Sequence, residues 1–346
     1  MFRAARARRI TTATAFGGGG LTLLGAGTIG LLYLQVRLAH RAIQRTNWAE
    51  PQVNGVYGSG DGAPLSLVMM GDSTAAGFAL TDGLQTPGSL LATGISAIAE
   101  RPVRMHNVAV VGATSADLAK QVERVRGTRA DVAVLFIGAN DVIQRLRPAD
   151  SARHLSAAAR ELTTMGTAVV VGTCPDLGTV EHIGWPLRYI ARRASRQLAA
   201  VQTIATVEGG GRTVSLGALL ADEFQANPDD MFGPDRFHPS ARGYAHAASA
   251  VLPSACVALG MLPELESVPD PSRGEEVLPI DRAAVEAAEE PGMEVSGARV
   301  AGHESGPRGR WATLIRRRSR AVPGGRGAKV TPGDPASGST GSTPSK

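Results

Sequence analysis

The chain has 346 residues, 43% of them hydrophobic, which is enough for one α/β domain of about 200 residues with extensions at both ends. Aromatic residues make up only 4%, whereas glycine (42) and proline (21) are abundant, so part of the chain is expected to lie outside any core. The formal charge of +5 would indicate a nucleic-acid partner if it were spread over the domain. Because the basic residues cluster at the two termini, we expect no nucleic-acid binding.

Residues 10–36 contain no charged side chain, and arginines flank them on both sides (Arg3, Arg6, Arg8 and Arg9 before; Arg37, Arg41 and Arg45 after). As a helix this run would be ~40 Å long, which exceeds the ~30 Å hydrocarbon thickness of a bilayer. The run is longer than the apolar part of a usual signal peptide, so residues 1–46 are predicted to hold an uncleaved transmembrane signal anchor. A cleaved signal is the alternative.

The hexapeptide GAGTIG, residues 25–30, formally matches the glycine pattern of dinucleotide-binding loops. That pattern needs a strand before it and a second strand ending in an acid about 20 residues later. The polar, arginine-containing stretch that follows is no such strand, so no dinucleotide site is predicted. Small residues at this spacing are more typical of a helix-packing face. Residues 47–64 are interpreted as a linker.

From Leu65 the chain alternates between two patterns. Apolar runs rich in β-branched residues stop at glycine and polar side chains, and they occupy residues 65–71, 102–112, 131–141 and 167–176, with a short strand near 212–216. Segments with apolar residues at helical spacing lie between and after them, at 88–100, 115–125, 148–165, 186–205 and 240–259. This alternation predicts βαβ units, and therefore an α/β fold with a central parallel sheet.

Polar residues follow the predicted strands at the points where a parallel sheet gathers its ligands: Ser73, Gly112, Asn140, and Asp235 with His238 before the last helix. A serine hydroxyl becomes a nucleophile when a base removes its proton, and histidine suits that task near neutral pH. Asp235 would hold the imidazole of His238 in the productive tautomer. The backbone N–H groups of Ser73 and Gly112 and the side-chain amide of Asn140 would form an oxyanion hole.

Four blocks carry a resemblance to a known family: GDS at 71–73, VGATS around Gly112, GAND at 138–141 and DRFHPS at 235–240. In order and spacing they resemble the GDSL or SGNH hydrolases over about residues 65–259, and we place the hydrolase domain at 65–262. The resemblance implies a three-layer α/β/α flavodoxin-like fold and hydrolysis of esters or thioesters without a metal. Thr74 departs from the family name, which implies leucine there, and this leaves the catalytic assignment little affected.

The remaining polar residues are interpreted as structural. Asp72 and Asp141 are expected to brace the loops by hydrogen bonds. His106, His154, His182 and His246 lack the spacing of metal ligands, so neither a metal nor another cofactor is predicted. Cys174 and Cys256 permit either one disulfide or two buried thiols.

Residues 263–346 lose the apolar periodicity and separate into an acidic block followed by a basic one. Such charge blocks predict a disordered, charged tail. The stretch RGRWATLIRRRSR within it, residues 308–320, is the alternative: a weak contact with anionic membrane or cell-wall components.

The leading functional interpretation is a membrane-anchored serine esterase or lipase that cleaves short-chain acyl or acetyl esters. Its partners would be a small-molecule or lipid ester and the membrane. The positive charge before the apolar run favours an N-terminus inside the cell, which places the catalytic domain outside the cytoplasmic membrane. Two alternatives stay open: an O-acetyl esterase of envelope polysaccharide or a thioesterase, and a catalytically silent cell-surface binding module.

Overall fold

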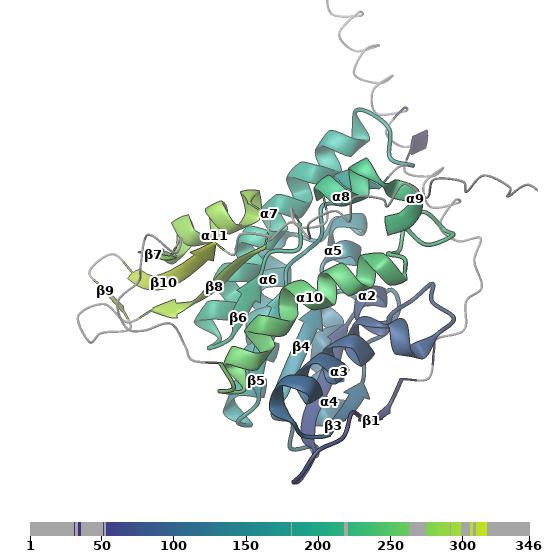
Figure 1. Ribbon diagram of the computed structural model, residues 1–346. Helices are drawn as coiled ribbons and strands as arrows, with labels where there is room; N and C mark the ends of the chain where they lie inside the picture. Colours follow the sequence, from purple (N-terminus) through teal and green to yellow (C-terminus); the bar gives the residue numbers. More distant parts are fainter. Residues whose placement is uncertain are drawn as a thin grey trace, which may run out of the picture.

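The computed structural model describes residues 31, 34–35, 51, 53–180, 182–217, 221–262, 275–290, 292–298, 305–306 and 309–316. Five parallel strands form the centre of its sheet in the order β3-β2-β4-β5-β6 (Figure 1). They are β2 (Leu65–Gly71), β3 (Val103–Asn107), β4 (Val132–Phe136), β5 (Ala168–Gly172) and β6 (Arg212–Val214). This is the strand order of flavodoxin-like folds, with the order reversing beside the first central strand. The predicted α/β class and flavodoxin-like sheet are confirmed.

Helices cover both faces of the sheet (Figure 1). Helices α3 (Pro87–Ala99) and α10 (Ala241–Ala258) lie on one face, and α4 (Leu118–Val125) and α6 (Pro148–Thr164) on the other, with α7 (Leu187–Glu208) beside α6. Helices α3, α6 and α10 begin within about one residue of the predicted start, because Thr86 and Ser240 cap α3 and α10 and prolines occupy the first turns of α3 and α6.

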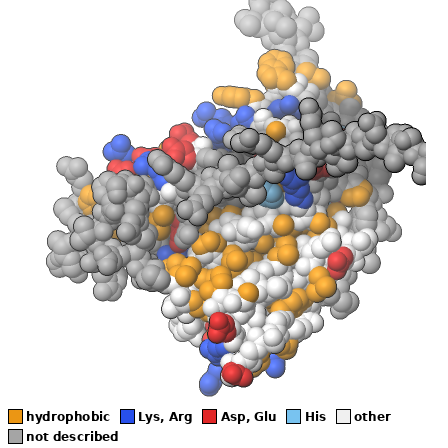
Figure 2. Space-filling view, in the orientation of Figure 1, with side chains coloured by type: hydrophobic (Ala, Val, Ile, Leu, Met, Phe, Trp, Pro, Cys, Tyr) orange, Lys and Arg blue, Asp and Glu red, His pale blue; other side chains and the backbone are white. Residues whose placement is uncertain are grey.

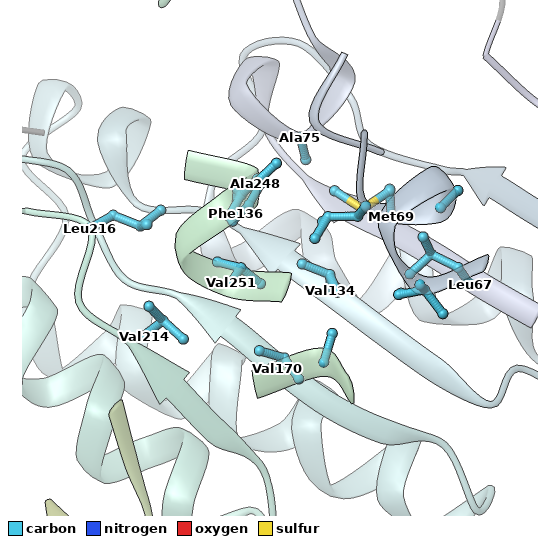
Figure 3. Packing of buried hydrophobic residues seen from close by; sticks show 14 of the residues in the cluster. Leu67, Met69, Ala75, Val134, Phe136, Val170, Val214, Leu216, Ala248 and Val251 are labelled. Carbon is cyan, nitrogen blue, oxygen red and sulfur yellow. The ribbon is translucent and has the colours of Figure 1, made fainter. Parts of the chain in front are cut away.

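Alternate residues of β2, β4 and β5 pack into two separate cores. Leu67 and Met69 of β2 pack with α3 and α10 in the larger cluster, of which Figure 3 shows a part, whereas Val68 and Met70 pack with α4 and α6. Because both faces of these three strands are buried, the strands are apolar at nearly every position instead of every second one. That explains the continuous apolar runs in the sequence.

Short elements complete the edge of the sheet at which the parallel strands end. They are α2 (Ser73–Ala76), α5 (Ala139–Ile143), α8 (Ala221–Ala226), α9 (Pro228–Met231), and the 3₁₀ turns η1 (Gly83–Gln85), η2 (Ser115–Asp117) and η3 (Leu177–Thr179). The strands after β2 end before the predicted residues. In particular, β3 ends at Asn107, so Gly112 lies five residues beyond it in a loop where Val110 and Val111 are exposed.

The interpretation of residues 47–64 as a linker is wrong in part. Residues Gly55–Tyr57 form β1, which pairs antiparallel with β3. Val53 is buried in the larger core, and the hydroxyl of Tyr57 donates to the carbonyl oxygen of Val53 at 2.5 Å. The strand has only three residues and is exposed on one side, so its sequence carries little of the periodicity that predicts a strand.

The prediction of a disordered tail is also wrong for part of residues 263–346. Strands β7 (Glu275–Pro279), β8 (Met293–Ala298), β9 (Ser305–Gly306) and β10 (Gly309–Arg316) and helix α11 (Ile280–Glu289) extend the sheet beyond β6 (Figure 1). All strand pairs in this extension are antiparallel, so the whole sheet is mixed. Part of the basic stretch 308–320 is therefore a paired strand.

The extension folds because its charges are paired and its small apolar residues form a core. Ala283 and Ala287 of α11 pack with Leu314 of β10 in a separate cluster. Arg316 forms ion pairs with Glu276, Glu286 and Glu290. Arg212 of β6 and Glu294 of β8 form a buried ion pair at 3.1 Å. The high charge content of this segment predicted disorder because it does not show that the charges are paired in the folded chain.

Most of the apolar run 10–36 lies outside the described residues, which include only Leu31, Leu34 and Gln35 of it. No helix within the described ranges is long and apolar enough to cross a membrane. Both cysteines are free and buried: Cys256 lies in the larger core, and Cys174 lies in a small cluster against α7.

Candidate active site

Ser73 is the first residue of α2, directly after the central strand β2. The chain turns sharply at Gly71, whose φ of 128° is a conformation that favours glycine. A Cβ atom at this position would also overlap the carbonyl oxygen of Phe136 in β4. The buried side chain of Gln121 holds this turn from both sides: it accepts from the N–H of Gly71 at 2.7 Å and donates to its carbonyl at 2.8 Å. Ser73 is thus fixed at the edge where parallel strands end.

His238 connects the other two predicted triad residues. Its Nε2 lies 3.0 Å from Oγ of Ser73, and its Nδ1 lies 2.6 Å from Oδ2 of Asp235. All three side chains are buried. The rings of Phe78 and Phe237 pack edge-on against the imidazole, with centroids 4.7 and 4.9 Å away, and restrict its rotation. The structure therefore brings the predicted Ser73, His238 and Asp235 into one hydrogen-bonded chain.

The turn between Asp235 and His238 explains their orientation. Oδ1 of Asp235 accepts from the backbone N–H groups of Phe237 and His238, both at 3.0 Å, which leaves Oδ2 for the imidazole. Burial by itself would raise the pKa of Asp235, but the hydrogen bond and charge of His238 and these two N–H groups outweigh it and lower that pKa. Asp235 therefore stays ionised beside the histidine.

Two loops at the same edge carry the other predicted residues. The amide of Asn140 donates one N–H to the carbonyl of Ala113 at 3.0 Å, which ties the start of α5 to the loop of Gly112. This loop is in turn joined to the serine turn, because the N–H of Val110 donates to the carbonyl of Gly71 at 3.1 Å. Gly112 has a φ of 83°, a conformation that favours glycine.

Three N–H groups on the serine turn and the two loops have no acceptor among the described residues. Asp72 accepts from the N–H of Thr74, at 2.9 Å, and no acceptor among the described residues takes the N–H of Ser73 or Gly112. Asn140 has a second amide N–H beyond the one that Ala113 accepts. These are the donors that the oxyanion-hole prediction names.

The expectation that Asp72 and Asp141 brace the loops is confirmed. Asp141 accepts from the backbone N–H of Ser115 and, at 2.6 Å, from the hydroxyl of Ser151 on α6. Asp72 caps α2. Burial is the main cause that raises the pKa of Asp72 to about 6, and the N–H of Thr74 offsets it only in part. A buried carboxyl group whose ionisation is unfavourable thus lies next to the proposed nucleophile.

Two positioning residues escaped the sequence analysis. Gln121 holds Gly71, as described above, and Gln202 of α7 is similar: it donates to the carbonyl of Ile137 at 2.8 Å and accepts from the N–H of Cys174 at 2.7 Å. Each glutamine satisfies backbone groups where a strand ends. Both side chains are buried, and each glutamine lies on the apolar face of an amphipathic helix. A polar residue at such a position was the available signal in the sequence.

A cavity next to Ser73 and His238 has about 50 Å³ of space that the centre of a water molecule can occupy. Its walls are mostly apolar side chains of the sheet, η3, α8 and the last loop, including Phe136, Leu177, Val180, Leu216, Phe224 and Phe237. A cavity of this kind admits a small apolar group beside the serine hydroxyl.

The other histidines do not join this site. His246 pairs with Glu223 at 2.9 Å. Within the part of the chain that the structure describes, no three His, Cys, Asp or Glu side chains form a group that could hold a metal ion.

The chain is similar to several known proteins. The sequence profile of the GDSL-like lipase/acylhydrolase family matches residues 69–246. The GDSL-like esterase Rv1075c of Mycobacterium tuberculosis is 40% identical over 251 residues, which cover 69% of this chain and 79% of that protein. Among solved structures, TesA aligns with a TM-score of 0.43 and 21% identity over 57% of this chain and 99% of its own. A catalytic mutant of the acetylxylan esterase Axe2 from Geobacillus stearothermophilus aligns with a TM-score of 0.43 and 17% identity over 59% and 99%.

A serine, a histidine and a carboxylate joined at the carboxyl edge of a flavodoxin-like sheet are the parts of a serine hydrolase. The chain belongs to the GDSL-like lipase/acylhydrolase family. It is accordingly a carboxylic ester hydrolase, as the resemblance implied.

Proposed function

We propose that the protein hydrolyses short-chain acyl or acetyl esters through a covalent acyl-enzyme on Ser73. The observation that carries the proposal is the position of the His238 ring, whose two nitrogens lie 3.0 Å from the serine hydroxyl and 2.6 Å from the carboxylate of Asp235. A base so placed can take the serine proton while its new positive charge is stabilised.

In the proposed acylation, Oγ of Ser73 attacks the ester carbonyl and its proton moves to Nε2 of His238. The carbonyl oxygen becomes negative and is met by the N–H groups of Ser73 and Gly112 and by the free amide N–H of Asn140. The intermediate then collapses, and the leaving alcohol takes the proton from His238. Water repeats the sequence on the acyl-enzyme, so that the acid is released and Ser73 regains its proton.

The size of the cavity supports a short acyl group. About 50 Å³ of space for water centres is room for a few water molecules, since one needs roughly 10–15 Å³ by this measure. An acetyl to butyryl group fits that space, whereas a long chain would have to extend out of it. Its apolar walls match an alkyl chain better than a sugar.

Rates of the full-length protein with p-nitrophenyl esters from acetate to octanoate test the proposal. Ser73→Ala should lower kcat at least 10³-fold, and His238→Ala should match it because triad members act as a unit. Ser254→Ala is the matched control, because Ser254 is also a buried serine and its hydroxyl has no hydrogen-bond partner within the described chain. A reactive alkyl phosphonate should add its mass to the Ser73 peptide. Hydrolysis by Ser73→Ala at the rate of the control would overturn the assignment.

We also propose that residues 10–36 anchor the protein in the cytoplasmic membrane with the catalytic domain outside. The flanking arginines and the length of the apolar run support this topology. Alkaline phosphatase, which is active only after export, should be active when fused at Asn47 or at the C-terminus. Inactive fusions at both positions, beside an active cytoplasmic reporter, would reverse the orientation. The basic residues beyond Arg316 are proposed to make a weak contact with anionic envelope components.

A further inference from the structure

The start of α7 and the loop before it expose a group of large apolar side chains. Trp185 is 80% exposed, Tyr189 64% and Ile190 45%. Arg193 and Arg196 are exposed on the following turns of the same helix. We call these five residues the α7 surface. Figure 2 shows hydrophobic and basic side chains together at the end of the molecule where α7 begins.

The chemistry of the α7 surface is that of a lipid–water interface. Tryptophan and tyrosine are enriched at the headgroup level of membranes, where one part of the ring is in an apolar environment and the other in water. Arginines beside them attract anionic headgroups, by about 1 kcal/mol each. Arg193 and Arg196 have no ion-pair partner among the residues that the structure describes, so their charges are available to an external anion.

The α7 surface is the outer side of the wall that lines the cavity beside Ser73. Turn η3 supplies Leu177 and Thr179 to that wall. The same turn packs on α7: a Cβ atom at Gly178 would lie 2.8 Å from Cβ of Arg192 and 3.1 Å from the carbonyl oxygen of Arg188. Leu177 and Ala191 of α7 share one apolar cluster. A partner bound to the α7 surface would therefore lie close to the substrate cavity.

The N-terminal apolar run meets the domain at this same surface. Nε2 of Gln35 donates to the carbonyl oxygen of Trp185 at 2.8 Å, and Leu34 and Leu31 before it are 51% and 43% exposed. Gln35 is the penultimate residue of the uncharged run 10–36. If that run spans the bilayer, its end at Gln35 places Trp185 at the depth of the headgroups.

We infer that the α7 surface docks on the anionic headgroup layer of the membrane that holds residues 10–36. This inference rests on the proposed membrane anchoring. Trp185 and Tyr189 enter the interface, Ile190 reaches the acyl boundary, and the two arginines bind lipid phosphates. The cavity then lies next to the lipid surface, so that amphipathic esters in that layer reach Ser73 by lateral diffusion.

The test uses the full-length protein reconstituted into vesicles of phosphatidylglycerol or of phosphatidylcholine. Ile190→Cys carries an environment-sensitive fluorophore, and Ile98→Cys is the matched control. Ile98 is also a 45% exposed isoleucine on a helix, but it lies near the end of α3, which leads to the amino-terminal edge of the sheet. The native Cys174 and Cys256 are buried and should not react.

In phosphatidylglycerol vesicles the label at position 190 should shift to shorter wavelength and be quenched by nitroxide lipids several-fold more than the label at 98. Arg193→Glu combined with Arg196→Glu should remove most of that difference. Equal quenching at both positions, in protein that floats with the vesicles and hydrolyses p-nitrophenyl acetate, would overturn the docking surface alone. Protein that fails to float would refute the anchor and, with it, the docking.

Discussion

Asp72, the residue before the proposed nucleophile, is expected to lower the stability of the fold at neutral pH. It is 1% exposed, and burial raises its pKa from 3.8 to about 6. Below pH 3.8 the carboxyl is protonated in both the folded and the unfolded chain. As the pH rises from 3.8 to 6, the unfolded chain loses the proton while the folded chain keeps it, so the free energy of unfolding falls. Above pH 6 the loss is constant.

The size of this loss follows from the two pKa values. The step from 3.8 to about 6, at 1.36 kcal/mol per pH unit, corresponds to about 3 kcal/mol. In Asp72→Asn the amide oxygen can still accept from the N–H of Thr74, so the cap of α2 is retained while the titration is removed. The free energy of unfolding of the variant, relative to wild type, should therefore increase by about 2–3 kcal/mol between pH 4 and pH 8.

Urea unfolding of the full-length protein in nonionic detergent, followed by circular dichroism from pH 4 to pH 8, measures this difference. Asp82→Asn is the matched control, because the exposed Asp82 caps η1 by the same bond, a 2.9 Å contact with the N–H of Leu84. The titration of Asp235 lies outside the measured range. Its pKa is lowered in the folded chain, so its stabilising effect is lost only as the pH falls below 3.8. A difference between Asp72→Asn and wild type that is flat across the range would refute the claim that burial dominates at Asp72.

Three further substitutions test the site and the extension. Asn140→Ala should lower kcat by ~10² to 10³ with a smaller change in KM, because its amide is proposed to bind the oxygen mainly in the transition state; an unchanged kcat would leave Asn140 only a structural role. In Gly172→Ala the new Cβ would lie 2.5 Å from Cε1 of Phe136 in the cavity wall, so kcat/KM should fall more for butyrate than for acetate esters, and an equal fall would place the acyl group elsewhere. Glu294→Gln removes the carboxylate charge that pairs with the buried Arg212 and should lower the free energy of unfolding by about 3 kcal/mol; a loss below about 1 kcal/mol in urea unfolding would contradict a buried, stabilising pair.

The amino-acid sequence alone determined the α/β class, the central strands and the three residues that the structure joins in one hydrogen-bonded chain. Strands buried on both faces are apolar throughout, and their ends need glycine and polar residues, so a local pattern marks both the strand and the place where chemistry can occur. Ser73 and His238 are 165 positions apart, yet each was recognisable from its own short block. The structure adds their 3.0 Å contact and the buried glutamines that hold the turn.

Only the tertiary structure showed that segments before β2 and after α10 form strands of the sheet. Residues 55–57 become a strand because the edge of β3 offers hydrogen-bond partners, and β8 pairs in the same way with the edge of β6. Arg212 and Glu294 lie in segments that the sequence separates by about 80 residues, and their charges are buried only because β6 and β8 pair. Strand pairing and charge pairing over such distances depend on what the rest of the chain presents, so no local pattern of hydrophobicity or charge can reveal them.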